Sequence, residues 1–352
     1  MDRLPLHVLT GFLGSGKTTL LNRLVRDPEF SDSAVLINEI GAVSIDHHLV
    51  DRIEPGDGLD VVILQGGCTC CAVRGDLVAA LRALYQRRAD GRVPLFRRVV
   101  LETTGLADPS PILFTLVGDP QLRHKFEAGS VIATIDVVHG LSQLERFVES
   151  RKQVAAADRL VLTKTDLADS DSMRRTLAAL ESLNPSAQVS DVHAPGMLAN
   201  LLSDPARSAT AWMAADPTQG ATADHTADVR AIAITLDEPI EWSPFAVWLS
   251  LLLHAHGDRI LRVKALLNVR DWPTPVALHG VHHLIHPPAH LAAWPPGPRH
   301  SRLVFIAQDL DVGRIEASLH AFLSAHSESA DGVVNSAPRL PVASVAARAD
   351  DP

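Results

Sequence analysis

The stretch that decides the fold is residues 6–24, which read LHVLTGFLGSGKTTLLNRL. The apolar run Leu6–Leu9 predicts a strand, and the amphipathic run that begins at Lys17 predicts a helix. The loop between them, Gly11–Thr18, fits the pattern G-x-x-x-x-G-K-[ST]. Backbone N–H groups of such a loop converge on phosphate oxygens, and the helix N-terminus adds positive charge. The stretch therefore predicts an α/β fold that binds a nucleoside triphosphate.

The chemistry of each loop residue indicates its role. Glycines let the backbone approach the phosphates, Lys17 can reach the β- and γ-phosphates, and the Thr18 hydroxyl can hold Mg²⁺. We expect Lys17 to lie in an exposed loop rather than in a core. The alternative is a glycine-rich turn without a ligand, which the flanking strand and helix disfavour. The predicted phosphate-binding set is Gly11, Gly14, Ser15, Gly16, Lys17, Thr18 and Thr19.

The composition is that of a globular protein. The chain has 352 residues, of which 46% are hydrophobic and 21% charged, and this length favours two domains. The net charge of −9 disfavours general nucleic-acid binding, because such binding needs Lys and Arg at the phosphates. Apolar runs fall far short of the about 18 residues of a membrane helix, and we expect no signal peptide. We predict a cytoplasmic protein without membrane association.

Short apolar strands alternate with helical stretches over the first 200 residues, which predicts a mostly parallel sheet. Further strands are expected at Ala34–Asn38, Val61–Leu64, Arg98–Glu102, Val131–Asp136 and Arg159–Thr163, and helices from Arg74, Asp108 and Ser142. We predict a P-loop domain at 1–201, a linker at 202–229, a smaller α+β domain at 230–326 and a disordered tail at 327–352. The second domain is expected to hold strands at Ala231–Leu236, Arg262–Asn268, His279–His286 and Ser301–Ala307, and helices at Ser243–Ala255 and Val312–Leu323.

A second polar group follows the predicted strand Arg98–Glu102, where Gly105 stands three residues after Glu102. This spacing matches the D-x-x-G pattern of nucleotide switches, with Glu in place of Asp. We predict that Glu102 acts on Mg²⁺ or its water and that the Gly105 N–H faces the γ-phosphate. A loop of this kind distinguishes a triphosphate from a diphosphate. A strand-terminal Glu without such a role is the alternative.

A third polar group ends the strand in RLVLTKTD, residues 159–166, which fits [NT]-K-x-D. Asp166 can accept two hydrogen bonds from the N1–H and N2–H₂ groups of guanine, which adenine does not offer. Lys164 is expected to lie along the base, and Thr163 to tie the loops together. The motif favours GTP over ATP, whereas a charged loop without a ligand is the alternative.

All three cysteines, Cys68, Cys70 and Cys71, lie within the segment GGCTCC. An odd number of cysteines so close together excludes a disulfide framework. Thiolates suit Zn²⁺, which takes four ligands, and Cu(I) is the competing metal. The fourth position is open to Glu39, a His or water. A buried or redox-active group of thiols is the alternative to a metal site.

Together these segments resemble the CobW-like metallochaperone GTPases. The resemblance reaches to about residue 325 and rests on GFLGSGKTTLLNRL, NEIGAVSID, GGCTCC, ETTGLADPSPI, TKTDL, RVKALLNV, HGVHHLIHPP and SRLVFIAQDLD. It implies GTP hydrolysis and delivery of a metal to a client protein. It also implies that Zn²⁺, or alternatively Co²⁺, binds at Glu39, Cys68, Cys70 and Cys71. Neither the client nor a homodimer is settled by the resemblance.

The chain departs from this family pattern at two places. The predicted linker keeps only His225 where many members carry a His-rich tract, and Ala265 stands where Gly is usual. Two other function classes are weighed. A P-loop kinase or ATPase acting on a small molecule is disfavoured by Thr163 and Asp166. A non-catalytic metal scaffold is disfavoured by Lys17 and Thr18.

Five histidines crowd residues 279–290, at positions 279, 282, 283, 286 and 290. On a continuous strand, His282 and His286 would share a face and His283 would point the other way. A secondary metal site is one interpretation of this cluster. Histidines that are satisfied within the fold or face solvent are the interpretation we favour.

Overall fold

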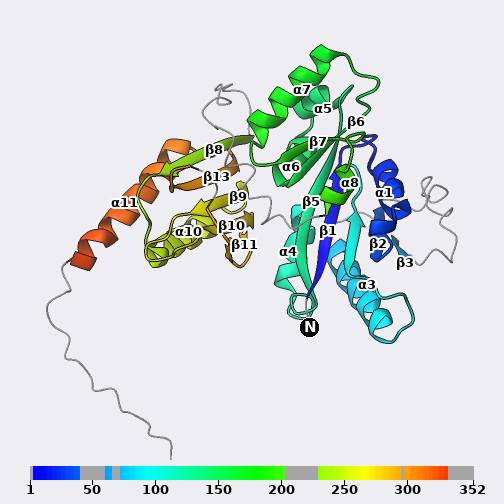
Figure 1. Cartoon of the computed structure of the whole chain (residues 1–352), viewed down its shortest axis with the longest axis horizontal. Coiled ribbons are helices and arrows are strands. Elements are labelled where there is room, and N and C mark those ends of the chain that lie inside the picture. Colours follow the sequence, from blue (N-terminus) through cyan, green and yellow to red (C-terminus); the bar gives the residue numbers. More distant parts are fainter. Residues whose placement is uncertain (1–2, 40–59, 66–71, 203–228, 295–296, 332–352) are drawn as a thin grey trace, which may run out of the picture.

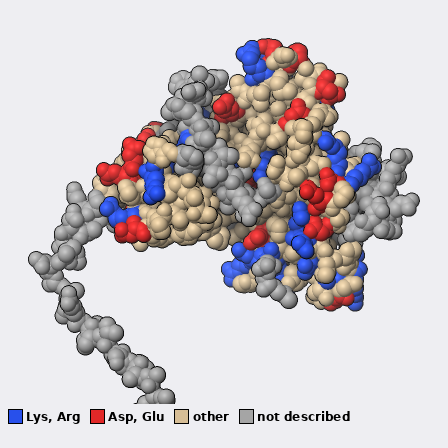
Figure 2. All heavy atoms as spheres, in the orientation of Figure 1, with Lys and Arg blue, Asp and Glu red and all other residues tan. Residues whose placement is uncertain are grey.

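The chain forms two sheets, each with its own helices (Figure 1). The computed structural model describes residues 3–39, 60–65, 72–202, 229–294 and 297–331. None of the helices in these ranges combines the length and hydropathy needed to cross a bilayer. On the face shown in Figure 2, acidic and basic side chains are interspersed, and neither sign forms a continuous surface.

The first sheet has seven strands in the order β3-β2-β4-β1-β5-β6-β7, and every neighbouring pair is parallel. Its strands are β1 Leu4–Gly11, β2 Ser33–Glu39, β3 Asp60–Gln65, β4 Arg98–Glu102, β5 Phe126–Asp136, β6 Arg159–Thr163 and β7 Gln188–Asp191. The winding reverses direction at the central strand β1, and ligands of open parallel sheets bind at the carboxyl ends beside such a point. The predicted parallel α/β architecture is confirmed.

Helices cover both faces of this sheet. They are α1 Lys17–Arg26, the short η1 Pro28–Phe30, α3 Ala72–Ala89, α4 Ser110–Gly118, α5 Gly140–Arg146, α6 Val148–Ala156, α7 Ser170–Leu183 and α8 Met197–Leu201. Successive residues of a strand face opposite sides. Leu6 and Val8 of β1 accordingly pack in the cluster that holds α3 and α4, whereas Leu9 packs against α1.

The sequence patterns do not predict α6, α7, α8 or β7. Helix α6 begins after a single residue, Phe147, that separates it from α5, so the two helices have no turn signal between them. The strand β7 has only four residues, and three of its side chains are half-buried. Such short segments carry little periodicity, and their packing defines them.

The second sheet is antiparallel, in the order β11-β10-β9-β13-β8, with β12 paired to β10. Its elements are β8 Val229–Leu236, α10 Trp242–His256, β9 Ile260–Leu267, β10 Val276–Val281, β11 Leu284–Ile285, β12 Ala289–His290, β13 Ser301–Gln308 and α11 Val312–Asp331. Its core joins α10 to the sheet and includes Phe245, Trp248, Ala265 and Phe305. This is the smaller α+β unit that the sequence predicts. Helix α11 continues past residue 327, where the tail was expected to begin, whereas residues 203–228 and 332–352 lie outside the described ranges.

The predicted strand His279–His286 is wrong as a continuous element. Strands β10 and β11 pair antiparallel, so residues 282–283 form the turn between them. His282 has φ of 52°, in the left-handed region of backbone space. His282 and His286 therefore do not share a strand face, and the Nδ1 atoms of His282 and His283 bond the carbonyl oxygens of Gly257 and Leu253 instead.

The two units pack against each other through apolar side chains. Val281 of β10 joins the cluster between the parallel sheet and helices α3 and α4. Leu261 of β9 and Ile306 of β13 join the cluster around α5, α6 and α7. All eight residues of β9 are buried, because one face meets α10 and the other meets the parallel sheet's domain.

Candidate functional site

The loop between β1 and α1 is held in shape by its own backbone and side chains. Gly14 and Gly16 have φ of 71° and 91°, which other residues rarely adopt. The Lys17 ammonium donates hydrogen bonds to the carbonyl oxygens of Gly11 and Phe12, at 2.9 and 3.1 Å. These contacts draw the side chain inward, so that Lys17 is only 9% exposed and the expectation of an exposed lysine is wrong.

Two oxygen ligands meet where α1 begins and β4 ends. The Thr18 hydroxyl donates to Glu102 Oε1 at 2.8 Å, and Glu102 is buried. The pairing joins residues from separate elements, 84 positions apart in the chain. Carboxylate and hydroxyl oxygens are the donors that Mg²⁺ prefers, so this pair fits a magnesium ion beside a bound triphosphate.

The segment after β4 packs directly on the phosphate loop. A Cβ atom at Gly105 would lie 2.6 Å from Leu13 Cδ2 and 2.8 Å from Leu13 N, which excludes any larger residue. The Thr103 hydroxyl donates to Thr10 Oγ1 at 2.9 Å. Gly105 is therefore required for a close approach between the two loops, apart from any role at the γ-phosphate.

The end of β6 is tied to the same loop. The Thr163 hydroxyl donates to the carbonyl of Ser15 at 2.8 Å, and the Lys164 ammonium donates to Asp136 Oδ2 at 2.7 Å. Lys164 has φ of 55°, which is unusual for a residue with a side chain. The Asp166 side chain is 64% exposed, with Oδ1 3.9 Å from His193 Nε2. The carboxylate is therefore accessible to an incoming base.

Two residues of this site are absent from the predicted set. The carboxylate of Asp136 accepts from Lys164 and from the backbone N–H of Val138, and the Thr134 hydroxyl lies 2.7 Å from Ser15 Oγ. Both belong to β5, at the sheet edge where the phosphate loop lies. The polar end of an otherwise apolar strand is the signal that could have identified Asp136. Thr134 carries no such signal, since it stands among apolar residues.

The predicted thiol site lies only partly within the described chain. Cys68, Cys70 and Cys71 fall in residues 66–71, outside the described ranges. The backbone at Glu39, the last residue of β2, is paired in register with Gln65, the last residue of β3. Within the described residues, no three His, Cys, Asp or Glu side chains lie close enough to hold a metal ion. The described part of the histidine cluster is therefore not a metal site.

Two family models match the chain. Residues 5–191 match "CobW/HypB/UreG, nucleotide-binding domain", and residues 229–323 match "Cobalamin synthesis protein cobW C-terminal domain". The zinc chaperone YjiA of Escherichia coli is 33% identical over 330 residues, which cover 90% of this chain and 98% of that protein. The zinc-regulated GTPase metalloprotein activator 1 of Schizosaccharomyces pombe is 31% identical over 194 residues, 52% of this chain and 45% of that protein.

The fold has solved relatives that extend over both units. A crystal structure of Zn(II)-bound YjiA GTPase from Escherichia coli has a TM-score of 0.70 and 28% sequence identity, and covers 92% of this chain and 99% of that one. A Zn(II)-bound triple mutant of YjiA, in which one Glu and two consecutive Cys are replaced by Ala, has a TM-score of 0.69, 28% identity and the same coverage.

Proposed function

The chain belongs to the CobW family of GTPases, and from that premise we propose that it couples GTP hydrolysis to delivery of a zinc-like metal to a client protein. The observation that carries the proposal is the convergence of Thr18, Glu102 and Gly105 on one phosphate loop. Residues 1–201 would bind the nucleotide and the metal, and residues 230–326 would form the second functional unit. We place this activity in the cytoplasm, because three clustered thiols suit a reducing compartment.

The nucleotide chemistry would come from residues at the carboxyl ends of the strands. Lys17 would exchange its two carbonyl acceptors for phosphate oxygens, while backbone N–H groups of Gly14, Ser15, Gly16 and Thr19 surround the phosphates. Thr18 and Glu102 would hold Mg²⁺, which neutralises charge that develops on the phosphates. Asp166 and Lys164 would select guanine, since Asp166 is exposed and the Lys164 backbone turns at that point.

The metal cargo would bind where β2 and β3 end together. The register pair Glu39 and Gln65 places the Glu39 backbone beside the residue that leads directly into the thiol segment. We propose that Glu39 joins the three cysteines as a ligand, because three thiolates leave one position of a tetrahedral Zn²⁺ site to fill. Co²⁺ is the second candidate for the same donor set.

Nucleotide and metal would influence each other through this geometry. Strand β2 lies beside β4, and Ile37 pairs in register with Glu102, so the two sites begin on adjacent strands. By linkage, a nucleotide that favours one arrangement of these loops must change metal affinity by the same factor that metal changes nucleotide affinity. A weaker grip on the metal after hydrolysis would suit its release to a client.

The proposal is tested by titrating the protein with Zn²⁺ against a chromogenic chelator, once with a non-hydrolysable GTP analogue and once with GDP. We expect the tightest site to differ in affinity by about 5- to 150-fold between the two nucleotides. Replacing Cys68, Cys70 and Cys71 together by Ser should abolish this difference and leave GTP binding intact. Thr69→Ser, in the same segment, is the matched control and should behave as wild type.

Total zinc content is not a sufficient readout, because the YjiA relative binds Zn(II) even with one Glu and two Cys replaced. The readout is therefore the nucleotide-dependent difference in affinity. Equal affinities with both nucleotides would refute the coupling and leave a GTPase that carries a metal without regulating it.

A further inference from the structure

Helix α6 connects the nucleotide site to the second domain. At its start, the ring of Phe147 packs on the ring of Phe12 in the phosphate loop, with centroids 4.7 Å apart. At its end, the carbonyl oxygen of Ala156 accepts a hydrogen bond from Arg262 of β9. One helix of nine residues thus contacts both the phosphate loop and the other domain.

Between these two contacts, α6 holds the segment that follows Glu102. The side-chain amide of Gln153 donates to the carbonyl oxygens of Gly105 and Ala107, at 3.1 and 3.0 Å. Gln153 is 1% exposed, so these bonds are shielded from water. The Lys152 ammonium lies 3.5 Å from Asp108 Oδ2 and adds a third contact to the same segment. One amide nitrogen therefore fixes the backbone on both sides of Leu106.

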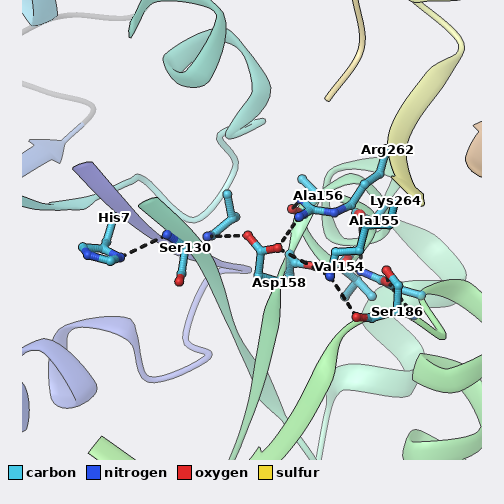
Figure 3. Close-up of polar contacts among 12 residues, drawn as sticks. His7, Ser130, Val154, Ala155, Ala156, Asp158, Ser186, Arg262 and Lys264 are labelled. Carbon is cyan, nitrogen blue, oxygen red and sulfur yellow. Dashed lines mark hydrogen bonds and ion pairs between the residues drawn. The ribbon is translucent and has the colours of Figure 1, made fainter. Parts of the chain in front are cut away.

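The other end of α6 is held by a buried ionic cluster (Figure 3). The guanidinium of Arg262 contacts both the Ala156 carbonyl and the Asp158 carboxylate. Asp158 also accepts from the backbone N–H of Val131 at 3.0 Å, and the Lys264 ammonium lies 3.5 Å away. A cation at the last carbonyls of a helix is favourable, because those groups lack partners within the helix.

Arg262 is firmly fixed in this position. It is 3% exposed, and moving a buried guanidinium away from its carboxylate leaves two charges without compensation. Lys264, two residues along β9, is equally buried but donates to the carbonyl oxygen of Ser186 and does not hydrogen-bond α6. Of these two neighbouring cations, Arg262 is the one that bonds the end of α6.

We propose that Gln153 is a positioning residue for GTP hydrolysis and that Arg262 sets its position through α6, so that the second domain controls the hydrolysis rate. The inference rests on the proposed function, since it requires Gly105 to act at the γ-phosphate. Gln153 touches no phosphate and acts only by placing the Gly105 backbone. The second domain is then a part of the GTPase mechanism as well as a separate fold.

The first test replaces Gln153 by Met, which keeps the side chain's length and removes both donors. We expect kcat for GTP hydrolysis to fall about 2- to 30-fold, the size typical of coupling residues. The KM for GTP should stay within about twofold of wild type, because the phosphate-loop and base contacts remain. A merely structural role would raise KM or lower the folded fraction instead.

The second test compares two neighbours on β9. Arg262→Met should lower kcat as Gln153→Met does, and the double variant should fall no further, because both changes release the same segment. Lys264→Met removes a buried cation from the same cluster without touching α6, and its kcat should stay within about twofold of wild type. Urea denaturation of each variant verifies that it is folded.

A variant that keeps the charge covers the case in which Arg262→Met does not fold. Arg262→Lys retains a cation for Asp158, but an ammonium lacks the planar fork that reaches both Asp158 and Ala156. The same fall in kcat is expected.

Additive effects of the Gln153 and Arg262 changes, or equal effects of the Arg262 and Lys264 changes, would overturn the inference. Wild-type protein without GTP hydrolysis would refute the proposed function instead, so the two failures are distinguishable.

Discussion

Strand β6 has a polar cluster at each of its ends, and the two clusters are built differently. At its carboxyl end, Thr163 and Lys164 bond the phosphate loop and Asp136, and Asp166 beyond them is 64% exposed. At its amino end, Asp158 is 7% exposed and lies between Arg262 and Lys264. The first cluster keeps an exposed carboxylate for a ligand, whereas the second is closed by the protein's own charges.

The electrostatics follow the same division. Burial alone would raise the pKa of Asp158, but the charges of Arg262 and Lys264 outweigh burial and hold that pKa well below its usual range. Burial lowers the pKa of Lys264 to about 8, against the opposing attraction of Asp158. Buried charges that compensate each other fix the position of two surfaces more than they stabilise them. The amino-end cluster is therefore a domain joint, and the carboxyl-end cluster is a binding site.

The sharpest test of this difference removes the charge of Asp158. Asp158→Asn leaves Arg262 and Lys264 buried without an anion, and we expect the free energy of unfolding at pH 7 to fall by about 3–5 kcal/mol. Urea denaturation measures the change. Asp171→Asn removes a carboxylate from an exposed ion pair on α7 and should cost less than about 1 kcal/mol. Equal losses in the two variants would mean that the joint is no more than a surface pair.

At the other end of β6, the largest effect is expected on activity instead. Lys17→Ala should lower kcat for GTP hydrolysis by about 10²- to 10³-fold, because a cation at the developing phosphate charge is lost. The free energy of unfolding should change by about 1 kcal/mol, the value of the bonds to Gly11 and Phe12. Phosphate release and urea denaturation give the two numbers. A variant that hydrolyses GTP at the wild-type rate would show that the loop does not serve catalysis.

A smaller effect is expected at the exposed carboxylate. Asp166→Ala should remove about 1–3 kcal/mol of the preference for GTP over ATP, since only guanine offers two donors to that side chain. Competition of both nucleotides against fluorescent GTP measures the preference. The stability of the variant should match wild type, because Asp166 lies outside the core. Equal competition by ATP and GTP against the wild-type protein would refute guanine selection.

The smallest effect concerns pH at the domain joint. Burial, aided by Arg98, lowers the pKa of His7 from 6.5 to about 4, and burial, aided by Lys264, lowers that of His279 to about 3. As the pH falls below about 6.5, the unfolded chain takes up protons that the folded chain does not, so stability falls. Between pH 7 and pH 5 each histidine should cost about 1–2 kcal/mol. Urea denaturation at both pH values measures the loss.

His279→Leu separates the two histidines. The ring nitrogens of His279 have no hydrogen-bond partner among the described residues, so an apolar replacement should cost little at pH 7. The variant should lose only about half as much stability as wild type between pH 7 and pH 5. An unchanged pH dependence would show that His279, next to Lys264, Asp158, Arg262 and His286, is not a source of it.

Several features could be predicted from the sequence because they are local. The phosphate loop, the acid at the end of β4 and the TKTD segment each occupy a few consecutive residues whose backbone their own chemistry restricts. The alternation of strands and helices then brings these segments to one edge of a parallel sheet. Pairs such as Thr18 with Glu102 followed from that placement, although the hydrogen bond itself was not specified.

The domain joint and the role of α6 could not be predicted in this way. Arg262 and Lys264 alternate with apolar residues along β9, a pattern typical of a strand with one face in water, yet both charges are buried. Their anion lies 104 residues away in the case of Arg262, and Gln153 meets Gly105 across 48 residues. The His282 turn likewise depends on carbonyls of a helix 25 residues earlier. The sequence by itself determined the parts that bind a nucleotide, because short segments encode them. Only the tertiary structure decided which charges are buried together, because burial depends on surfaces that distant parts of the chain supply.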